Sequence, residues 1–336
     1  MKSMKFSVII CTYMRPHSVI RLLDSLLLQT IMADEILLID GSVNTETAQV
    51  VNPYYEKLPL SYHSVQPEER GLTLQRNVGV RLSSESSDVL VFLDDDVVLS
   101  EDFLKHLISC FTDSEVVGSD GLVTNECRWI PCEKQPKSNR YMFIDGYKLT
   151  LSARDRLRSY LGLFPKHIQP GITPLYGHGK SSLPPTGKSY EVDHLIGCMM
   201  AFRRSLFSQI KFSSYFIGYG LYEDYDFSVR AGKFGKLITN TAARLEHHHA
   251  PSGRPNTYKY GKMVVSNGWY VWRLKHPHPG MINIFKWHMI TLLLMLFRLT
   301  NVISMNSETR RQALGDFAGR TVAWFKLIFI KPRPKL

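Results

Sequence analysis

The chain has 336 residues, of which 44% are hydrophobic and 21% are charged, and its formal net charge is +11. This length and composition are typical of a globular protein with one large or two ordinary domains, and they exclude a disordered chain. The positive charge is concentrated near the C-terminus, because residues 281–336 hold nine Lys or Arg against two acidic residues, a net charge of +7.

The five cysteines are scattered along the chain, and no two of them form a Cys-x-x-Cys pair. An odd number without such pairs disfavours a disulfide framework or a zinc site and indicates a reducing compartment. The N-terminal apolar run is too short for a signal peptide and is better explained as a first strand. We therefore expect a cytoplasmic protein.

The first hundred residues alternate between strand and helix patterns. Their apolar runs are continuous, which marks strands covered on both faces, and such strands form a parallel sheet with helices on each side. This pattern predicts an α/β fold of Rossmann-like type, with ligands at the carboxyl ends of the strands. The expected strands are residues 6–13, 35–40, 60–66 and 89–94, and the expected helices are residues 18–30, 45–58 and 72–84.

Beyond residue 100 the pattern becomes mixed. Residues 164–188 hold five Pro and four Gly, which excludes regular structure. This segment is either a loop beside the site or a surface insertion. Residues 190–207 predict a strand that leads through Gly197 into a helix. Further helices are expected at residues 102–111 and 223–235, and further strands at 116–125 and just before 245–253.

The C-terminal segment differs in kind from the rest. Residues 281–303 are apolar, but Lys286 and Arg298 leave only eleven residues between charges. A membrane-spanning helix needs roughly 20, so we do not expect one. A second apolar stretch, residues 322–330, precedes a basic end, and apolar faces with cations bind anionic lipid surfaces. The alternative is that these helices pack on the rest of the chain or form a dimer contact.

Three consecutive carboxylates, Asp94, Asp95 and Asp96, follow the fourth predicted strand. Like charges so close repel one another, so a positive group is expected beside them. In an extended backbone Asp94 and Asp96 lie on one side and Asp95 on the other. Hard divalent cations such as Mg²⁺ and Mn²⁺ prefer oxygen ligands of this kind. The cluster therefore predicts a metal site, and the alternative is a solvated turn.

Six stretches of the chain occur in the order seen in the GT-A glycosyltransferases, and the sequence resembles glycosyltransferase family 2. Each stretch is a weak signal by itself, but their order and spacing are specific. The resemblance covers roughly residues 5–252 and implies a GT-A fold and a nucleotide-sugar donor. The stretches are "FSVIICTYMRPHSVIRLLDSLLLQT", "EILLIDGS", "RGLTLQRNVGV", "VLVFLDDDVVLSEDFL", "GCMMAFRRSLF" and "YGLYEDYDFSVRAGKFG".

The resemblance implies roles for residues at the strand ends. The first strand of the family ends in Thr-Tyr-Asn-Arg, which touches the nucleotide. Here Thr12, Tyr13 and Arg15 match, and Met14 replaces the Asn. Asp40 matches the residue that reads the base. The other nucleotide-sugar contacts that the resemblance implies are Arg76, Asn77, Asp94 and Asp95, with Asp94 toward the ribose.

Metal and catalytic residues follow from the same resemblance. It implies Asp96 as a ligand of Mn²⁺ or Mg²⁺ across the diphosphate, with a His after a later strand as a further ligand. His247 is the preferred match and His249 the second, because alternate residues of an extended run share one side. The base that removes the acceptor proton is implied at Glu223 and Asp224, with Asp224 preferred. Without the resemblance, these acids would be an ordinary first helical turn.

We therefore expect a GT-A domain over residues 1–255, followed by a helical, basic and apolar extension over residues 256–336. The nucleotide-binding half is expected at about 1–100 and the acceptor half at about 101–255. The expected reaction is an inverting, metal-dependent transfer from a UDP-, GDP- or dTDP-sugar to a saccharide or lipid-linked hydroxyl, in surface polysaccharide or glycolipid synthesis. The extension would place the protein at the cytoplasmic face of a membrane. Nucleic-acid binding is not expected, because the cations follow an apolar tail.

Two other functions remain open at this stage. An Asp-nucleophile phosphatase would use the stretch "LDDDV", but it leaves the upstream motifs unexplained. A catalytically silent carbohydrate- or lipid-binding protein would keep the fold without the chemistry. The presence of both the aspartate triplet and the Glu223–Asp224 pair argues against a silent protein.

Overall fold

The computed structural model describes residues 4–138, 140–165, 170–177, 181–216, 218–250, 255–303 and 306–333. The chain divides into two compact units. The first comprises Met1–Arg128 and Ser181–Gly253, and the second comprises Trp129–Lys180 and Arg254–Leu336. The sequence placed residues 129–180 in the first domain, whereas the structure groups them with the C-terminal helices. Local periodicity does not reveal which helices a stretch packs against.

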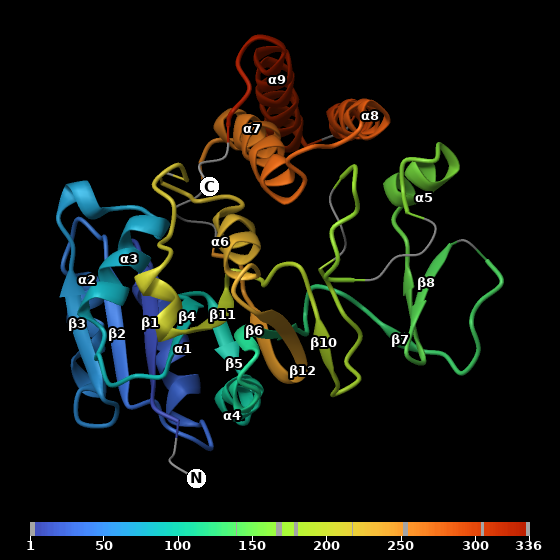
Figure 1. Cartoon of the computed structure of the whole chain (residues 1–336). Helices are drawn as coiled ribbons and strands as arrows, with labels where there is room; N and C mark the ends of the chain where they lie inside the picture. The colour runs from blue at the N-terminus through green and yellow to red at the C-terminus, as the bar shows by residue number, and fades with distance from the viewer. Residues whose placement is uncertain are drawn as a thin grey trace. The chain divides into compact units, whose positions relative to one another are not determined.

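The first unit is built on a central sheet with helices on both faces (Figure 1). Its strands are β1 (Phe6–Thr12), β2 (Glu35–Asp40), β3 (Leu60–Ser64), β4 (Val89–Asp94), β5 (Val97–Leu99), β6 (Val116–Val123), β10 (Ser189–Glu191), β11 (Met199–Arg203) and β12 (Lys236–His247). Its α-helices are α1 (Pro16–Leu27), α2 (Glu46–Val51), α3 (Leu72–Leu82), α4 (Phe103–Ser109) and α6 (Glu223–Ala231). All the elements expected in the first hundred residues are therefore present. Helix α2 is shorter than expected because Pro53 has no backbone N–H to continue its hydrogen bonds, and the chain goes on as a 3-10 helix over Asn52–Tyr54.

The order of strands places a crevice at one edge of this sheet. Among the described residues the order is β10-β12-β6-β11-β4-β1-β2-β3, and β5 pairs with β12. Strands β4, β1, β2 and β3 are parallel, as the continuous apolar runs predict. The chain winds from β1 toward β3 and then crosses to β4 on the other side. In open α/β sheets ligands bind at such a reversal, here between the carboxyl ends of β1 and β4.

The segment around Gly197 differs from the sequence prediction. The strand lies after Gly197, as β11, and the expected helix is a short 3-10 helix over Arg204–Ser208. Strand β11 runs antiparallel to both β4 and β6 and joins them. The side chains of Met199–Phe202 are fully buried on both faces of the sheet. Periodicity does not distinguish such a short buried strand from a buried helix segment.

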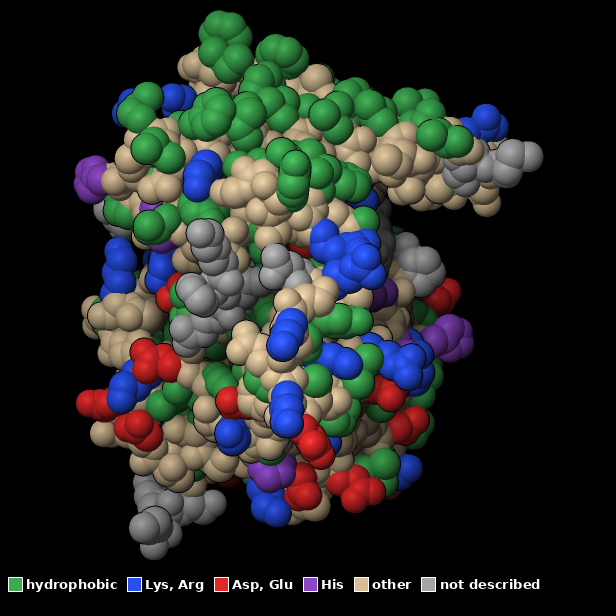
Figure 2. Space-filling model, turned by 90° about the vertical axis from the view of Figure 1, so that its right-hand side faces the viewer, with side chains coloured by type: hydrophobic (Ala, Val, Ile, Leu, Met, Phe, Trp, Pro, Cys, Tyr) green, Lys and Arg blue, Asp and Glu red, His purple; other side chains and the backbone are tan. Residues whose placement is uncertain are grey.

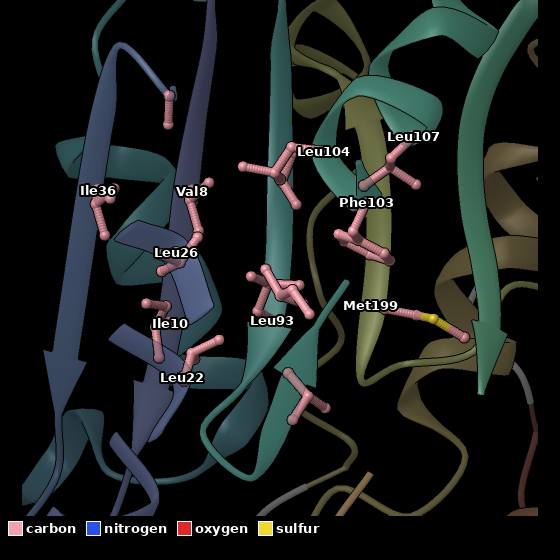
Figure 3. Close-up of a cluster of buried hydrophobic side chains, with 14 of the residues drawn as sticks. Val8, Ile10, Leu22, Leu26, Ile36, Leu93, Phe103, Leu104, Leu107 and Met199 are labelled. Carbon is pink, nitrogen blue, oxygen red and sulfur yellow. The ribbon is translucent and has the colours of Figure 1, made fainter. Parts of the chain in front are cut away.

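Two hydrophobic clusters cover the two faces of the sheet. Alternate residues of β1 point to opposite faces, so that Val8 and Ile10 join one cluster while Ile9 joins the other. The first cluster contains side chains from α1 and α4 and from eight strands, and Figure 3 shows part of it. The second contains side chains from α3 and α6. These clusters fix the sheet on which the carboxyl-end residues are held.

The second unit is mainly helical. Its elements are β7 (Ile130–Pro131), β8 (Tyr141–Ile144), β9 (Tyr147–Thr150), α5 (Ala153–Tyr160), α7 (Thr257–Lys275), α8 (Met281–Leu299) and α9 (Ser307–Phe329). Trp269, Trp272 and Trp287 form a buried aromatic core with ring centroids 4.9–5.7 Å apart. The described parts of residues 164–188, which are 164–165, 170–177 and 181–188, contain no helix or strand, as the Pro and Gly content predicts.

The apolar helix α8 corrects one exclusion made from the sequence. The stretch Met281–Ile303 is long and apolar enough to cross a membrane by length and composition, with a mean hydropathy of 1.4. Only 17% of its most apolar window is buried inside the structure. Counting residues between Lys286 and Arg298 was too strict, because two cations do not abolish the apolar character of the whole helix.

Candidate active site

Polar side chains gather at the crevice between β1 and β4. Thr12 ends β1 and Asp94 ends β4, and the two strands are in parallel register. The chain turns at Asp95 and Asp96 and returns as β5. The hydroxyl of Thr12 donates to Oδ2 of Asp95 across the crevice at 2.7 Å. The triplet is therefore held by the neighbouring strand.

Each carboxylate of the triplet has a cationic partner in the protein. Arg15 lies 2.9 Å from Asp95 and 3.5 Å from Asp96, and Arg76 lies 3.2 Å from Asp94. Asp95 is buried, and burial raises its pKa to about 6 although Arg15 and Thr12 favour the charged form. The positive group expected beside the triplet is thus supplied in part by these two arginines.

Asp94 and Asp96 meet His247 at the end of β12. One ligand atom from each lies within 4.8 Å of the others, and Nε2 of His247 is 3.1 Å from Oδ1 of Asp96. Asp95 takes no part in this group, as the alternation of the triplet predicts. Two carboxylates and one imidazole form a donor set that suits Mn²⁺, and carboxylates also suit Mg²⁺. These three residues fit the metal that the sequence implied.

The surroundings of His247 favour positive charge. Burial opposes protonation, but hydrogen bonds to Asp96, Cys198 and Glu126 outweigh it and raise the pKa of His247 to about 12. The same contacts act on Asp96, where burial raises the pKa but His247 and the backbone N–H of Ala250 lower it below its usual value. This end of the crevice is therefore a site that stabilises a cation.

Two residues that the sequence analysis missed hold His247 in place. The side chain of Asn125 accepts from the backbone N–H of His247 and donates to its carbonyl, both at 3.0 Å. Oε1 of Glu126 lies 3.0 Å from Nδ1 of His247 and 3.0 Å from Nε2 of His249. His248 turns away and pairs with Glu246. No local motif marks Asn125 or Glu126, because their role depends on the parallel pairing of β6 with β12.

Arg76 and Glu223 form a buried ion pair beneath the crevice. Arg76 is 2% exposed and Glu223 4%. The guanidinium contacts Glu223 and Asp94 and donates to the carbonyl of Gly197 at 2.8 Å. Burial raises the pKa of Glu223 to about 8, with Arg76 opposing the shift and Asp224 adding to it. Arg76 therefore joins the start of α6 to the end of β4.

Asp224 is the less buried member of the acidic pair at the start of α6. Its Oδ2 accepts from the backbone N–H of Gly197 at 3.0 Å, and its Oδ1 accepts from Tyr225 N–H at 2.8 Å. A Cβ at Gly197 would lie only 3.0 Å from the Cβ of Asp224, so this close approach requires glycine. Asp224 also acts electrostatically on Asp94 and raises its pKa, together with burial and Asp96. The carboxylate is thus fixed in orientation near the metal-ligand group.

The remaining predicted nucleotide contacts, Tyr13, Asp40 and Asn77, differ in exposure and in their hydrogen-bond partners. Tyr13 is 43% exposed at the edge of the sheet. Asp40 is 1% exposed, and its two oxygens accept from Ser42 N–H and the Tyr62 hydroxyl. The amide of Asn77 exchanges two hydrogen bonds with the backbone of Phe212 and so fastens the segment that holds it. The buried Gln75, which the sequence analysis missed, donates to the carbonyls of Thr12 and Ile39.

Comparison with known proteins gives a family match. A family model described as "Glycosyl transferase family 2" matches residues 7–211. A search of curated proteins found no significant match.

Solved structures of similar fold also match. TarS of S. aureus is 18% identical, with a TM-score of 0.50 over 94% of this chain and 48% of that one, so this chain spans about half its length. The mannosyltransferase PcManGT from Pyrobaculum calidifontis, in complex with GDP-Man and Mn²⁺, is 14% identical over 97% of this chain and 88% of that one, with a TM-score of 0.54. GalNAc-T7 with UDP, GalNAc and Mn²⁺ is 14% identical over 97% and 57%, with a TM-score of 0.53. Such likeness shows the GT-A fold, as predicted.

Proposed function

This chain belongs to glycosyltransferase family 2, and we propose from that membership that it transfers a sugar from a nucleotide-sugar donor to a hydroxyl acceptor. The observation that carries the proposal is the meeting of Asp94, Asp96 and His247 at one end of the sheet, within 4.8 Å of one another. Two of the neighbours of similar fold are complexes with a nucleotide or nucleotide sugar and Mn²⁺, which supports this class of donor and metal.

Asp94, Asp96 and His247 would hold Mn²⁺ or Mg²⁺. When bound, such a cation stabilises the charge that develops on the departing nucleoside diphosphate without any proton transfer. Thr12, Arg15 and Arg76 fix the triplet, so that its carboxylates are oriented before the donor arrives. The exposed ring of Tyr13 lies at the same edge and is proposed to contact the nucleotide.

Asp224 is proposed as the base. It takes the proton of the acceptor hydroxyl while the hydroxyl oxygen forms a bond to the anomeric carbon and the bond from that carbon to the diphosphate breaks. A single displacement of this kind inverts the anomeric centre. Hydrogen bonds from Gly197 and Tyr225 hold the carboxylate in place for this step. Glu223, buried against Arg76, is proposed to position the start of α6 rather than to accept the proton.

The acceptor is proposed to be a saccharide or a lipid-linked hydroxyl. The basic and apolar second unit supports a lipid-linked acceptor, as in the synthesis of a surface polysaccharide or glycolipid.

A donor panel tests the proposed function. The full chain is incubated with UDP-, GDP- and dTDP-sugars and Mn²⁺, and the release of free nucleoside diphosphate is measured. We expect release with at least one donor, and a fall of roughly 10²- to 10⁴-fold in kcat for Asp224→Asn, with donor affinity nearly unchanged. The control is Glu85→Gln, an exposed acid at the opposite end of β4. Donor binding without any turnover would instead indicate a silent binding protein.

A further inference from the structure

The two units of the chain carry opposite charge. The first unit has 18 Lys and Arg against 25 Asp and Glu, a net charge of −7, and the second has 23 against five, a net charge of +18. The overall charge of +11 is therefore the sum of the charges of a strongly basic unit and an acidic unit. A surface with this charge attracts anionic partners and repels a second copy of itself.

Helix α9 has an unpartnered apolar face. Its buried residues, which include Asp316, Ala323 and Leu327, face the unit's own core. On the opposite side, residues spaced by eight, three and four positions form an exposed stripe of Leu314, Val322, Phe325 and Phe329. Phe325 is 54% exposed and Phe329 84%. Such large apolar side chains are rarely left in water without a partner.

Helix α8 also has an exposed apolar face opposite its buried residues. Only Trp287, Ile290 and Met295 of its 19 residues are buried, although nearly the whole helix is apolar. Met281, Ile282, Phe285 and Leu296 are exposed on the side opposite the buried residues. Figure 2 shows hydrophobic side chains gathered in one region of the visible surface, with Lys and Arg side chains near them. Exposed cations, Lys326, Lys331 and Arg333, stand at the end of the α9 stripe.

We propose that the second unit docks on an anionic lipid bilayer through the exposed apolar faces of α8 and α9. The apolar side chains enter the boundary between headgroups and acyl chains, and the surrounding Lys and Arg neutralise lipid phosphates. Charge alone would fit a nucleic acid, but a duplex presents phosphates and sugars on its outside and would leave the exposed Phe and Ile side chains in water. A second copy would cover them but would bring another +18 against the first.

Vesicle co-sedimentation of the full chain tests this docking. Vesicles of phosphatidylcholine with phosphatidylglycerol are compared with vesicles of phosphatidylcholine alone, at low and high salt. We expect binding to the anionic vesicles that weakens with salt, and a loss of roughly a hundredfold for the double variant Phe325→Glu/Phe329→Glu. The matched control is Leu28→Glu, a similarly exposed apolar residue of the first unit, which leaves binding unchanged.

Three outcomes would overturn the docking proposal. One is that the wild-type chain stays in the supernatant with both kinds of vesicle. The second is binding that the double variant does not weaken and that double-stranded DNA displaces, which would indicate a nucleic-acid surface. The third is a dimer, measured by light scattering, that the double variant splits while vesicle binding stays absent.

A second inference concerns Glu126, which lies beside the metal-ligand group of Asp94, Asp96 and His247. This inference rests on the proposed function. Nε2 of His247 faces Asp96 while its Nδ1 lies 3.0 Å from Glu126, which itself lies outside that group. A carboxylate that accepts the Nδ1–H of an imidazole leaves the lone pair on Nε2 for a metal. We infer that Glu126 is a positioning residue, which fixes the tautomer and ring orientation of His247.

Mn²⁺ binding, followed by electron paramagnetic resonance without donor or acceptor, tests the role of Glu126. We expect Glu126→Gln to weaken Mn²⁺ affinity roughly ten- to hundredfold, and to have no further effect in a His247→Ala background. The exposed Glu246, which pairs with His248, provides the control Glu246→Gln.

Two results bear on this inference separately from the proposed function. If Asp96→Ala abolishes Mn²⁺ binding while Glu126→Gln leaves it unchanged, the positioning role fails and the metal site stands. An effect of Glu126→Gln that persists in the His247→Ala background would make Glu126 a direct ligand and would also overturn the inference. If Asp96→Ala itself has no effect, the proposed metal site fails.

Discussion

Nε2 of His247 lies 3.1 Å from Oδ1 of Asp96, so the last residue of β12 meets the turn that follows β4. The two residues are far apart in the sequence and belong to different halves of the sheet.

Metal binding should stabilise the folded chain through this contact. A ligand present at a hundred times its Kd stabilises the native state by about 2.7 kcal/mol, which corresponds to a few degrees in Tm. We expect Mn²⁺ to raise the Tm of the wild-type chain and not that of Asp96→Asn, as measured by calorimetry, and chelation to reverse the shift. Asp102→Asn, an exposed acid of the same unit, is the control. An equal shift in the Asp96→Asn variant would place the ion elsewhere.

The buried pair of Arg76 and Glu223 should matter for stability. Removing one partner of a buried pair leaves the other charge uncompensated, which costs roughly 3–5 kcal/mol. We expect Arg76→Met to lower the free energy of unfolding by about this amount in a urea titration. The double variant Arg76→Met/Glu223→Leu should lose less than the sum of the two single variants. Additive losses would show that the two side chains do not depend on each other.

The buried carboxyl group of Asp120 should make the free energy of unfolding depend on pH. It accepts from Thr239 and from the backbone N–H of Ile196, but burial raises its pKa to about 7. The folded state then holds the proton more tightly than the unfolded state, whose Asp has a pKa of about 4. Its contribution is therefore complete below about pH 4 and is lost as the pH rises toward 7.

Replacing Asp120 by Asn should remove this dependence. Between about pH 4 and pH 7, the unfolding free energy of the wild-type chain should fall relative to that of Asp120→Asn by on the order of a few kcal/mol. Urea titrations at pH 5 and pH 8 measure the difference. A constant difference between the two proteins at both pH values would contradict the raised pKa.

The backbone of Met14 has a left-handed conformation, which Asn adopts more readily than Met. Its φ is +56°, in the left-handed region, and its N–H donates to the hydroxyl of Ser42 at 2.8 Å. Asn tolerates this region better than Met, and the resemblance places Asn at this position. We expect Met14→Asn to raise the free energy of unfolding by roughly 0.5–1 kcal/mol in a denaturant titration, and Met14→Val to lower it. A less stable Met14→Asn variant would mean that packing of the Met side chain outweighs the backbone strain.

The sequence determined the local features of the site. Continuous apolar runs located β1, β2 and β4, a weaker strand pattern located β3, and the polar residues after these strands predicted the edge at which ligands bind. The alternation of side chains correctly separated His248 from His247 and His249, whereas Asp95 is separated from Asp94 and Asp96 at a turn. These features depend on residues near one another in the chain, where the period of two is visible directly.

The tertiary structure alone decided which distant residues meet. Glu126 contacts His247 across 121 residues, and Arg76 contacts Glu223 across 147. Both contacts depend on the order of strands in the sheet, in which β11 lies antiparallel between β4 and β6. Strand order is set by how the two faces of the sheet pack, and it cannot be predicted from the hydrophobic periodicity of a single segment. For the same reason only the tertiary structure shows that Arg76 and Glu223 are buried against each other and that the amide of Asn77 is bonded to the backbone of Phe212.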